Sequence, residues 1–524
     1  MSLACRLALG LLLVISFASG AAADEAADRT AARAKMIARI DELIDAKIKA
    51  AGMQPAARAS DEEFLRRVYL DLTGAIPRVS EVRAFLADKS ADKRQKLIDA
   101  LLDSPSHATH LANIWRAIML PGATNFEQIN NVVGVQNWLR QRFAENLRYD
   151  NLVSDLLVEV NGGDQGPALY FTSLELAPEK IAGSSARIFL GLQIECAQCH
   201  DHPFDKWKQK EFWGYAAFFA RLKQNDPNAM RTGRRGSIED ADKGEVTLPG
   251  KDEVVPPKYP GGAAVQDEPN STRREQLAVW MASRDNPYLP KAGTNRVWWH
   301  VFGRGLVEPV DDLGPQNPAS HPELFAELTS YFIKSGFDIR ELYRTLANTA
   351  AYQRTSVWTG ETPPPPELYV RMPIKSLTAE QLYDSVNRVL HRKTTSMMPG
   401  VNIESPLLDP QRQAFLAKLD TRGRNALDYQ AGILQALALL NGRDLAEATD
   451  PVNSPLLGSI QAPFFGDDDR LRTLFLAALA RQPSDEELTL CRAQLAKYSE
   501  SDLGKAYSDI LWSLLNGAEF ALNH

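Results

Sequence analysis

The chain has 524 residues, of which 44% are hydrophobic and 24% are charged, and its formal net charge is −7 at pH 7. This length is enough for two or three domains with sizeable cores. The mildly acidic balance excludes the electrostatic footprint of a nucleic-acid-binding protein, and four cysteines are too few for a disulfide-stapled scaffold.

The N-terminus has the pattern of a secretory signal peptide. Arg6 is followed by an apolar run, Leu7–Ala18, and then by the small residues Gly20–Ala23. The run of twelve residues is too short to span a bilayer, and the alanines form an Ala-x-Ala type cleavage site. We therefore expect residues 1–23 to be removed. The remaining chain is expected to be exported, periplasmic or at the cell surface, with no transmembrane segment.

Helical periodicity dominates the rest of the chain. In chain order, helices are predicted over 31–51, between Ser60 and Gly74, over 80–87, 91–103, 107–119, 132–147, 177–194 and 211–220, after Thr272, over 322–334 and 338–352, after Thr378, and over 426–441, 468–481, 484–497 and 502–521. Residues 152–158 fit either a helix or a strand, and residues 398–425 are expected to be irregular. Capping-box pairs mark several of the helix starts.

Residues 223–270 differ in character from their surroundings, because Pro, Gly and charged residues dominate them. Short strands are expected there at Val246–Leu248 and Glu253–Val255. The predicted fold class is therefore mostly α, with two helical domains joined by a long irregular segment with a few short strands. The domains are expected over 24–222 and 271–524, with 223–270 as a linker or insertion.

The stretch Glu195–Trp207 contains Cys196-Ala-Gln-Cys199-His200, the Cys-x-x-Cys-His signal for attachment of a c-type haem. Two cysteines at this spacing reach neighbouring vinyl groups of one macrocycle, and the next residue, His200, falls under the iron as its proximal ligand. The pattern predicts covalent haem c at Cys196 and Cys199, with electron transfer or redox chemistry at the cell envelope. The distal ligand is not readable; Met230 and His202 are candidates, but His202 is too near His200 in sequence to reach the opposite haem face easily.

Other interpretations of the same stretch stay open, and whether the protein is an enzyme is undecided. His202 adds a fourth Cys or His ligand, and Asp205 lies three residues further on, where it shares a helical face with His202. The cluster therefore also suits a non-haem metal or hydrolytic site of the zinc type. Alternatively, Cys196 and Cys199 form a redox dithiol, or a structural disulfide in a cell-surface interaction protein with no cofactor.

Aromatic side chains are dense just after the motif, with seven between Phe204 and Phe219. Because Phe212, Tyr215 and Phe219 share a helical face, they are expected to form either a core helix or one wall of a haem pocket, and the two are compatible. Further along, His300 and His321 are expected to be structural histidines rather than ligands. The adjacent Asp311 and Asp312 would point apart and make a poor acid/base pair.

The motif and its surroundings are similar to a known family. Cys196–Trp207 resembles the signature of the exported, planctomycete-type cytochrome-associated family, domain of unknown function 1549, and Phe64–Gly74 and Phe212–Phe219 resemble its opening and closing motifs. The second half resembles domain of unknown function 1553, at Asn295–Gly305, Val310–Asp312, Ser320–Leu324, Leu437–Asn441, Ala478–Ser484 and Trp512–Phe520.

This resemblance implies an exported location but no settled activity. Many relatives have an additional N-terminal cytochrome domain with its own Cys-x-x-Cys-His, whereas residues 24–60 contain no cysteine here. The family is often encoded beside an exported alkaline-phosphatase-like family. The resemblance therefore implies such a protein, or a redox partner, as a candidate partner.

The signal peptide yields the first testable prediction. When the chain is expressed with its leader in an exporting host, Asp24 is expected to become the first residue, because the cleavage pattern ends at Ala23. N-terminal sequencing of the exported product measures this. Exported protein that keeps Met1, or that stays firmly in the membrane fraction, would contradict it.

Overall fold

The computed structural model is mostly helical, as the periodicity predicts. It describes residues 3–120, 126–159, 166–224, 238–284, 286–390, 409–419, 449–451 and 454–524, without the side chains of 3–25, 126–133, 410 and 417–419. Among these residues the only sheets are three antiparallel pairs of short strands. None of the described helices is both long and apolar enough to cross a membrane.

The helices of the first half follow one another with short connections. They are α1 (Leu3–Ala50), α2 (Asp61–Thr73), α3 (Val79–Ala87), α4 (Lys93–Leu102), α5 (Pro105–Met119), α6 (Phe126–Ala144), α7 (Tyr149–Val158), α8 (Ala168–Ser173), α9 (Pro178–Ser185) and α10 (Gln209–Ala216). Residues 152–158, which fitted a helix or a strand, are helical. A π-helix, η2 (Ala186–Leu190), and a 3-10 helix, η3 (Glu195–Gln198), lie between α9 and α10.

The second half is built in the same way. Its helices are α11 (Arg273–Ala282), α12 (Leu289–Phe302), α13 (Pro322–Lys334), α14 (Ile339–Ala347), α15 (Ala379–Leu390), α16 (Pro410–Leu419), α19 (Pro455–Ile460), α20 (Asp467–Leu479), α21 (Asp485–Leu495) and α22 (Leu503–Asn516). The irregular structure expected over 398–425 is wrong for 410–419, which form α16. The helix predicted at 426–441 lies outside the described residues.

Short strands lie in the segment 223–270, which differs from the rest of the chain in composition. β1 (Leu222–Gln224) pairs with β2 (Ile238–Asp240), and β3 (Val246–Thr247) pairs with β4 (Val254–Val255), where short strands were predicted. A third pair joins β5 (Lys375–Ser376) to β6 (Leu522–Asn523). The second pair contributes to a small apolar cluster of its own with Ala217 and Leu248.

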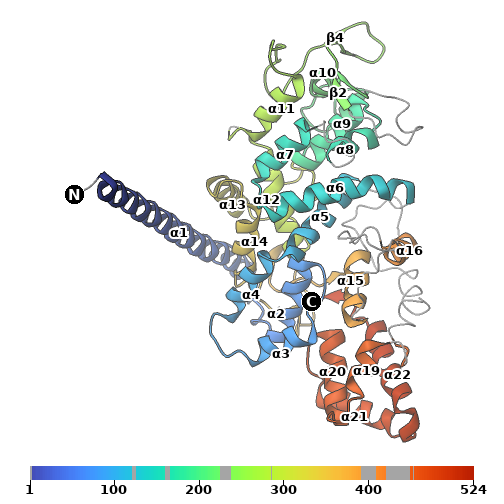
Figure 1. Cartoon of the computed structure of the whole chain (residues 1–524). Helices are drawn as coiled ribbons and strands as arrows, with labels where there is room; N and C mark the ends of the chain where they lie inside the picture. The colour runs from blue at the N-terminus through green and yellow to red at the C-terminus, as the bar shows by residue number, and fades with distance from the viewer. Residues whose placement is uncertain are drawn as a thin grey trace.

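Helix α1 docks on the second half through its C-terminal part. Met36, Ile40, Ile44 and Ile48 are buried at helical spacing, while Arg33 forms an ion pair with Glu341 at 2.7 Å. In Figure 1 the N-terminal part of α1 extends away from the body of the protein. These docking contacts all follow Ala23, so removal of the predicted leader leaves them in place.

The main hydrophobic core runs through both halves. One cluster of buried side chains extends from Met36 through Phe219 to Met372, and a second gathers around α15 and α19–α22. Helix α2 contributes to both, because Phe64 belongs to the first cluster and Leu70 to the second. In Figure 1, α2 lies between the upper helices and the group α19–α22 at the bottom.

Helix α2 begins and ends where its residue types predict. The Ser60 hydroxyl accepts a hydrogen bond from the Glu63 backbone N–H at 3.1 Å, and Gly74 ends the helix in the left-handed region with φ 75°. The carboxylate of Glu63 does not close the expected capping box. It binds Arg67 at 2.6 Å and the Ser356 backbone N–H at 2.7 Å instead.

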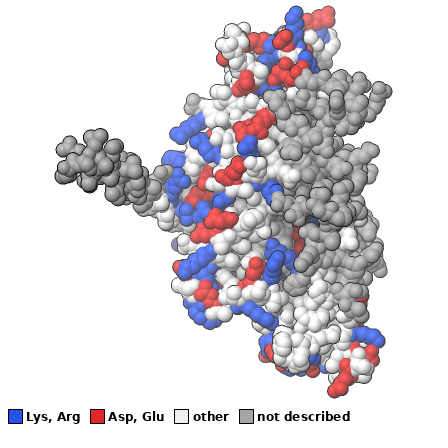
Figure 2. Space-filling view, in the orientation of Figure 1, with Lys and Arg blue, Asp and Glu red and all other residues white. Residues whose placement is uncertain are grey.

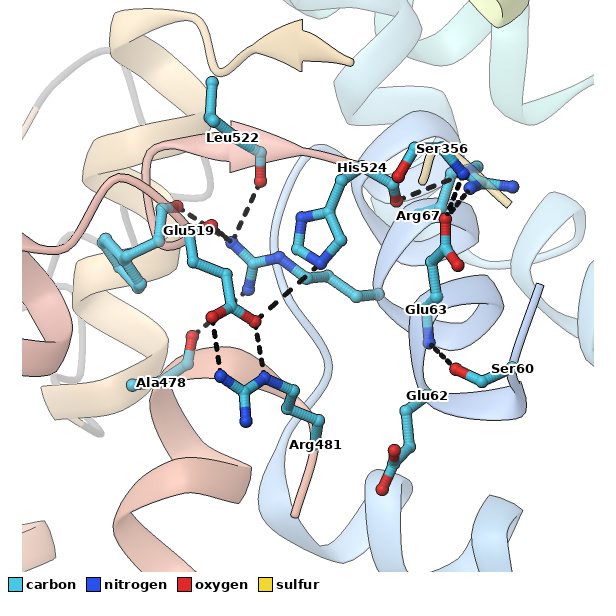
Figure 3. A network of polar contacts seen from close by, with 12 residues as sticks. Ser60, Glu62, Glu63, Arg67, Ser356, Ala478, Arg481, Glu519, Leu522 and His524 are labelled. Atoms are coloured by element: carbon cyan, nitrogen blue, oxygen red, sulfur yellow. Dashed lines mark hydrogen bonds and ion pairs between the residues drawn. The ribbon is translucent and has the colours of Figure 1, made fainter. Parts of the chain in front are cut away.

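The two buried arginines of α2 bind the end of the chain. Arg66, which is 0% exposed, donates to the carbonyl oxygens of Ala478 at 3.2 Å and Phe520 at 2.8 Å, and also to those of Glu519 and Leu522. Figure 3 shows Arg67 reaching His524 and Glu63 in the same network. Burial lowers the pKa of Arg66 to about 10, so the guanidinium stays charged at neutral pH.

Charges of both signs are interspersed on the surface. On the face drawn in Figure 2, lysine and arginine side chains alternate with aspartate and glutamate over the described part of the chain. In the described part of that face, Figure 2 shows no large surface of one charge sign.

The Arg66 contacts generate a stability prediction. Replacing Arg66 with Met removes a charged donor and leaves several buried carbonyls without a partner, so the free energy of unfolding is expected to fall by about 3 kcal/mol. Denaturant titration of the full chain measures the change. Arg83→Met is the control, because Arg83 is exposed and makes one hydrogen bond, to Thr473; its expected effect is within about 0.5 kcal/mol. Equal effects of the two variants would refute this role.

Candidate functional site

The Cys-x-x-Cys-His motif lies in a surface loop between two buried helices. The helix predicted over 177–194 ends earlier, because α9 widens into the π-helix η2 and Gly191 then turns the chain with φ 65°. A Cβ at position 191 would lie 2.7 Å from Cγ of Leu313, so glycine also permits close packing there. The 3-10 helix η3 follows and carries Cys196, and α10 starts at Gln209.

The three residues of the motif present their reactive groups to solvent. Cys196 and Cys199 are exposed and are free thiols, and His200 is exposed as well. The Nδ1 atom of His200 lies 2.7 Å from the carbonyl oxygen of Asp201. A carbonyl oxygen can only accept, so Nδ1 carries the proton, and the Nε2 lone pair is left for a metal ion.

His202 and Asp205 have local structural roles in this loop. The His202 ring nitrogen Nδ1 accepts from the Phe204 backbone N–H at 3.2 Å, and Asp205 accepts from the Lys206 N–H at 2.6 Å. Within the described ranges, no group of three His, Cys, Asp or Glu side chains is arranged to hold a metal ion. The structure therefore does not bring the zinc-type ligand set together.

Helix α10 holds the motif loop through hydrogen bonds. The side-chain amide of Gln209 donates to the carbonyls of Gln198 at 3.2 Å and Cys199 at 2.9 Å, and the Trp213 indole N–H donates to Gln198 at 3.0 Å. The Asp201 carboxylate accepts the Gln209 backbone N–H at 2.9 Å, and this hydrogen bond holds the pKa of Asp201 below its usual value. The sequence did not predict this role for Gln209, because a glutamine binds these carbonyls only once the loop is folded.

The aromatic residues after the motif are core residues. Phe212, Tyr215 and Phe219 are at most 1% exposed, and Tyr215 packs edge-on against Phe219 with ring centroids 5.8 Å apart. Tyr215 also shares a hydrogen bond of 3.0 Å with Ser185 of α9. Phe204 is the exception, because it is 77% exposed beside the motif. The interpretation of Phe212, Tyr215 and Phe219 as core residues is therefore correct.

The second half of the chain places two carboxylates, Asp311 and Asp312, near the residues that precede the motif. The Nε atom of Arg187 lies 3.9 Å from Glu195 and 3.8 Å from Asp311, and the Gln193 amide reaches Asp311 at 3.5 Å. Burial, with smaller contributions from Asp311 and Asp312, raises the pKa of Glu195. Asp312 instead accepts the Gly314 N–H at 3.2 Å, so the two adjacent aspartates have different partners.

A histidine cluster lies apart from the motif, between α5 and α12. His110 and His300 have ring centroids 5.4 Å apart, and Tyr343 donates to or accepts from His300 Nδ1 at 2.9 Å. The Nε2 atoms of His107 and His110 are buried and have no hydrogen-bond partner. The spacing of His107 and His110 on one predicted helix was the signal that sequence analysis missed.

The structural role expected for His300 and His321 fits their surroundings. His321 is buried, with Nδ1 at 3.2 Å from the Ser320 hydroxyl. Burial lowers the pKa of His107 to about 4, that of His300 to about 3 and that of His321 to about 4. Burial also holds the pKa of His110 well below its usual value. These histidines are therefore neutral in the folded protein at neutral pH.

Two protein-family models match the chain. Residues 39–224 match PSCyt2, a protein of unknown function (DUF1549), and residues 273–430 match PSD1, a protein of unknown function (DUF1553). The chain therefore belongs to the proteins that carry a DUF1549 domain followed by a DUF1553 domain, in the order that its motifs predicted. No curated protein and no solved structure matches it.

The buried histidines predict an acid-sensitive fold. Their folded-state pKa values lie below the unfolded value of about 6.5, so their neutral forms stabilise the fold fully above pH 6.5 and this stability is lost as pH falls toward 4. Each such histidine steepens the loss by up to about 1.4 kcal/mol per pH unit. Denaturant titrations at pH 7, 6, 5 and 4.5 measure it.

Two variants test the source of this pH dependence. His300→Asn keeps an acceptor for Tyr343 but removes a titrating ring, so its stability should fall less steeply with acidification. His200→Gln changes an exposed histidine and should follow the wild type. Wild-type stability that stays constant between pH 7 and 4.5 would show that these histidines do not destabilise the fold on protonation.

Proposed function

We propose that this chain binds one c-type haem covalently through Cys196 and Cys199, with His200 as the proximal iron ligand. The observation that carries the proposal is the state of His200. Its Nδ1–H is engaged by the Asp201 carbonyl at 2.7 Å, while the ring is exposed. A metal-ligating histidine ordinarily donates its other ring N–H to such a carbonyl, which sets the tautomer and the ring orientation.

The two thiols suit the attachment chemistry. Each S–H adds across one vinyl double bond of the haem, so that sulfur bonds to one carbon and the proton goes to the other. Both Cys196 and Cys199 are free and exposed, so a bulky macrocycle can approach them from solvent. The Gln209 side-chain amide donates to the Cys199 carbonyl at 2.9 Å. This hydrogen bond fixes the backbone next to the proximal ligand.

Bound haem would supply one-electron redox chemistry, and the chain would supply its position and surroundings. Phe204 and Pro203 are exposed on the same loop and provide apolar cover at its edge. The exposed motif favours exchange of electrons with a partner at the cell surface or in the periplasm, although redox action on a cell-envelope substrate uses the same site. A redox protein or an exported alkaline-phosphatase-like protein is the proposed partner.

Expression of the chain with its leader in a host that matures c-type cytochromes tests the proposal. Denatured protein is expected to keep its Soret band and to carry the added mass of one haem, whereas Cys196→Ala/Cys199→Ala should carry none. Colourless wild-type protein with both thiols free, from that host, would refute the proposal.

The variant His202→Ala separates haem from a zinc-type site. Because His202 binds the Phe204 N–H within the loop, covalent haem should be retained when it is replaced. In a zinc-type site His202 would be one of four Cys or His ligands, so its loss would sharply reduce bound metal. Haem content and total metal content of both proteins are measured together. Zinc without haem in the wild type, lost in the variant, would establish the alternative, and a Cys196–Cys199 disulfide without metal would establish the interaction-protein interpretation.

A further inference from the structure

The segment that delivers the chain to Cys196 depends on an unusual backbone turn. In the π-helix η2 the Ala186 carbonyl accepts the Gly191 backbone N–H, and it also accepts that of Leu192 at 3.1 Å. The wider turn makes a helix irregular, and such turns occur frequently at functional sites. Only five residues separate Leu190 from Cys196, so a change in the turn moves the thiols directly.

A buried arginine from the second half binds this turn. Arg296 of α12 is 5% exposed, and its Nη2 donates to the carbonyl of Ile188 in η2 at 3.3 Å. Its guanidinium also lies over the Trp115 ring, 5.9 Å from the centroid, and Trp115 stacks on Phe189 of the same turn. The turn is thus enclosed by α5 on one side and α12 on the other.

The partners of Arg296 are unusual for a buried charge. In the part of the chain that the structure describes, no carboxylate lies within ion-pair distance of Arg296, and its Nε has no hydrogen-bond partner. Burial lowers the pKa of Arg296, and the electrostatic attraction of Tyr149 and Asp311, neither of which forms an ion pair with it, offsets only part of this cost. A residue that served only to fill the core could be apolar, so the cost indicates a positional role.

The adjacent residue, Asn295, supports a second contact to the same segment indirectly, through the loop 307–313. Its side chain donates to the carbonyls of Val307 at 2.9 Å and Val310 at 3.1 Å and accepts the Val307 N–H at 3.0 Å. It thereby holds the loop that ends in Leu313, whose backbone N–H donates to the Gly191 carbonyl at 2.8 Å. Of these neighbouring residues in one DUF1553 motif, Arg296 thus binds the middle of the turn that precedes the DUF1549 motif, and Asn295 binds the loop that contacts its end at Gly191.

We propose that Arg296 is a positioning residue for the Cys-x-x-Cys-His loop, acting through the π-helical turn 186–190, so that the site is assembled from both domains. The proposal deepens the haem function and rests on it for its cofactor, but the positioning itself concerns the protein alone. DUF1549 supplies the reactive groups, and DUF1553 determines where they lie.

The first test uses full-length protein prepared without haem. Hydrogen–deuterium exchange of peptides covering 188–202 is compared between wild type and Arg296→Met, which keeps most of the volume but lacks the donor. Exchange in these peptides is expected to accelerate by about tenfold, the effect of one lost hydrogen bond to a charged group. Arg296→Lys, which keeps a cationic donor, should restore part of the protection.

Arg274→Met is the matched control. Arg274 is also buried and also crosses between the halves, but it binds the Leu157 carbonyl and Asp240. Its replacement should lower global stability without selective acceleration in 188–202. Should Arg296→Met fail to fold, Arg296→Lys takes its place: a lysine cannot reproduce the guanidinium geometry, so exchange in the same peptides should still exceed that of the wild type.

The second test uses haem-loaded protein and measures a property that global stability does not change. Arg296→Met should shift the haem reduction potential and the axial-ligand absorption bands, while Arg274→Met should leave both at wild-type values. If the wild type carries no haem, the proposed function fails, and the exchange data still decide the role of Arg296. Unchanged exchange in 188–202 for Arg296→Met would overturn the positioning role, as would equal acceleration in Arg274→Met.

Discussion

The structure depends on the burial of α2 together with its charges. Arg66 and Arg67 are at most 1% exposed, and they are tolerated because carbonyl groups from distant segments solvate them. Asp71 on the same helix accepts hydrogen bonds from Lys375, Asn523 and Tyr352. Removing one partner would leave a buried charge or carbonyl unpaired, which costs far more than the net gain of a hydrogen bond. The helix therefore requires that the middle and the end of the chain fold against it.

This shared interior explains how a surface loop can be held accurately. Cys196, Cys199 and His200 are exposed to solvent. Their backbone, however, is hydrogen-bonded by Gln209 from one side and reaches Arg296 through the preceding turn. Rigid support behind an exposed site is what the proposed haem would require, because a protein can tune a cofactor only if the distances around it stay constant.

Histidines in this protein have two opposite environments. His200 is exposed, with one ring nitrogen engaged by a carbonyl, whereas His107 and His110 are buried with an Nε2 atom that has no partner. Burial disfavours the charged form of the buried pair, so they act as neutral packing groups that tie α5 to the second half. Gly74 belongs to the same arrangement, because a Cβ there would lie 2.5 Å from the His110 ring.

Local patterns in the sequence were sufficient to predict most of the helices and to find the Cys-x-x-Cys-His motif. Helical periodicity and caps such as Ser60 and Thr272 predicted most helices, because these signals act within a few residues. The Cys-x-x-Cys-His spacing likewise predicted a haem-attachment site without a fold. Only the tertiary structure decided that Gln209 binds the loop and Arg296 the turn before it, that Phe212 belongs to the core, and that the core runs through both halves. Those properties depend on contacts between residues far apart in the chain, and the periodicity of a single helix shows which face is buried but not what buries it.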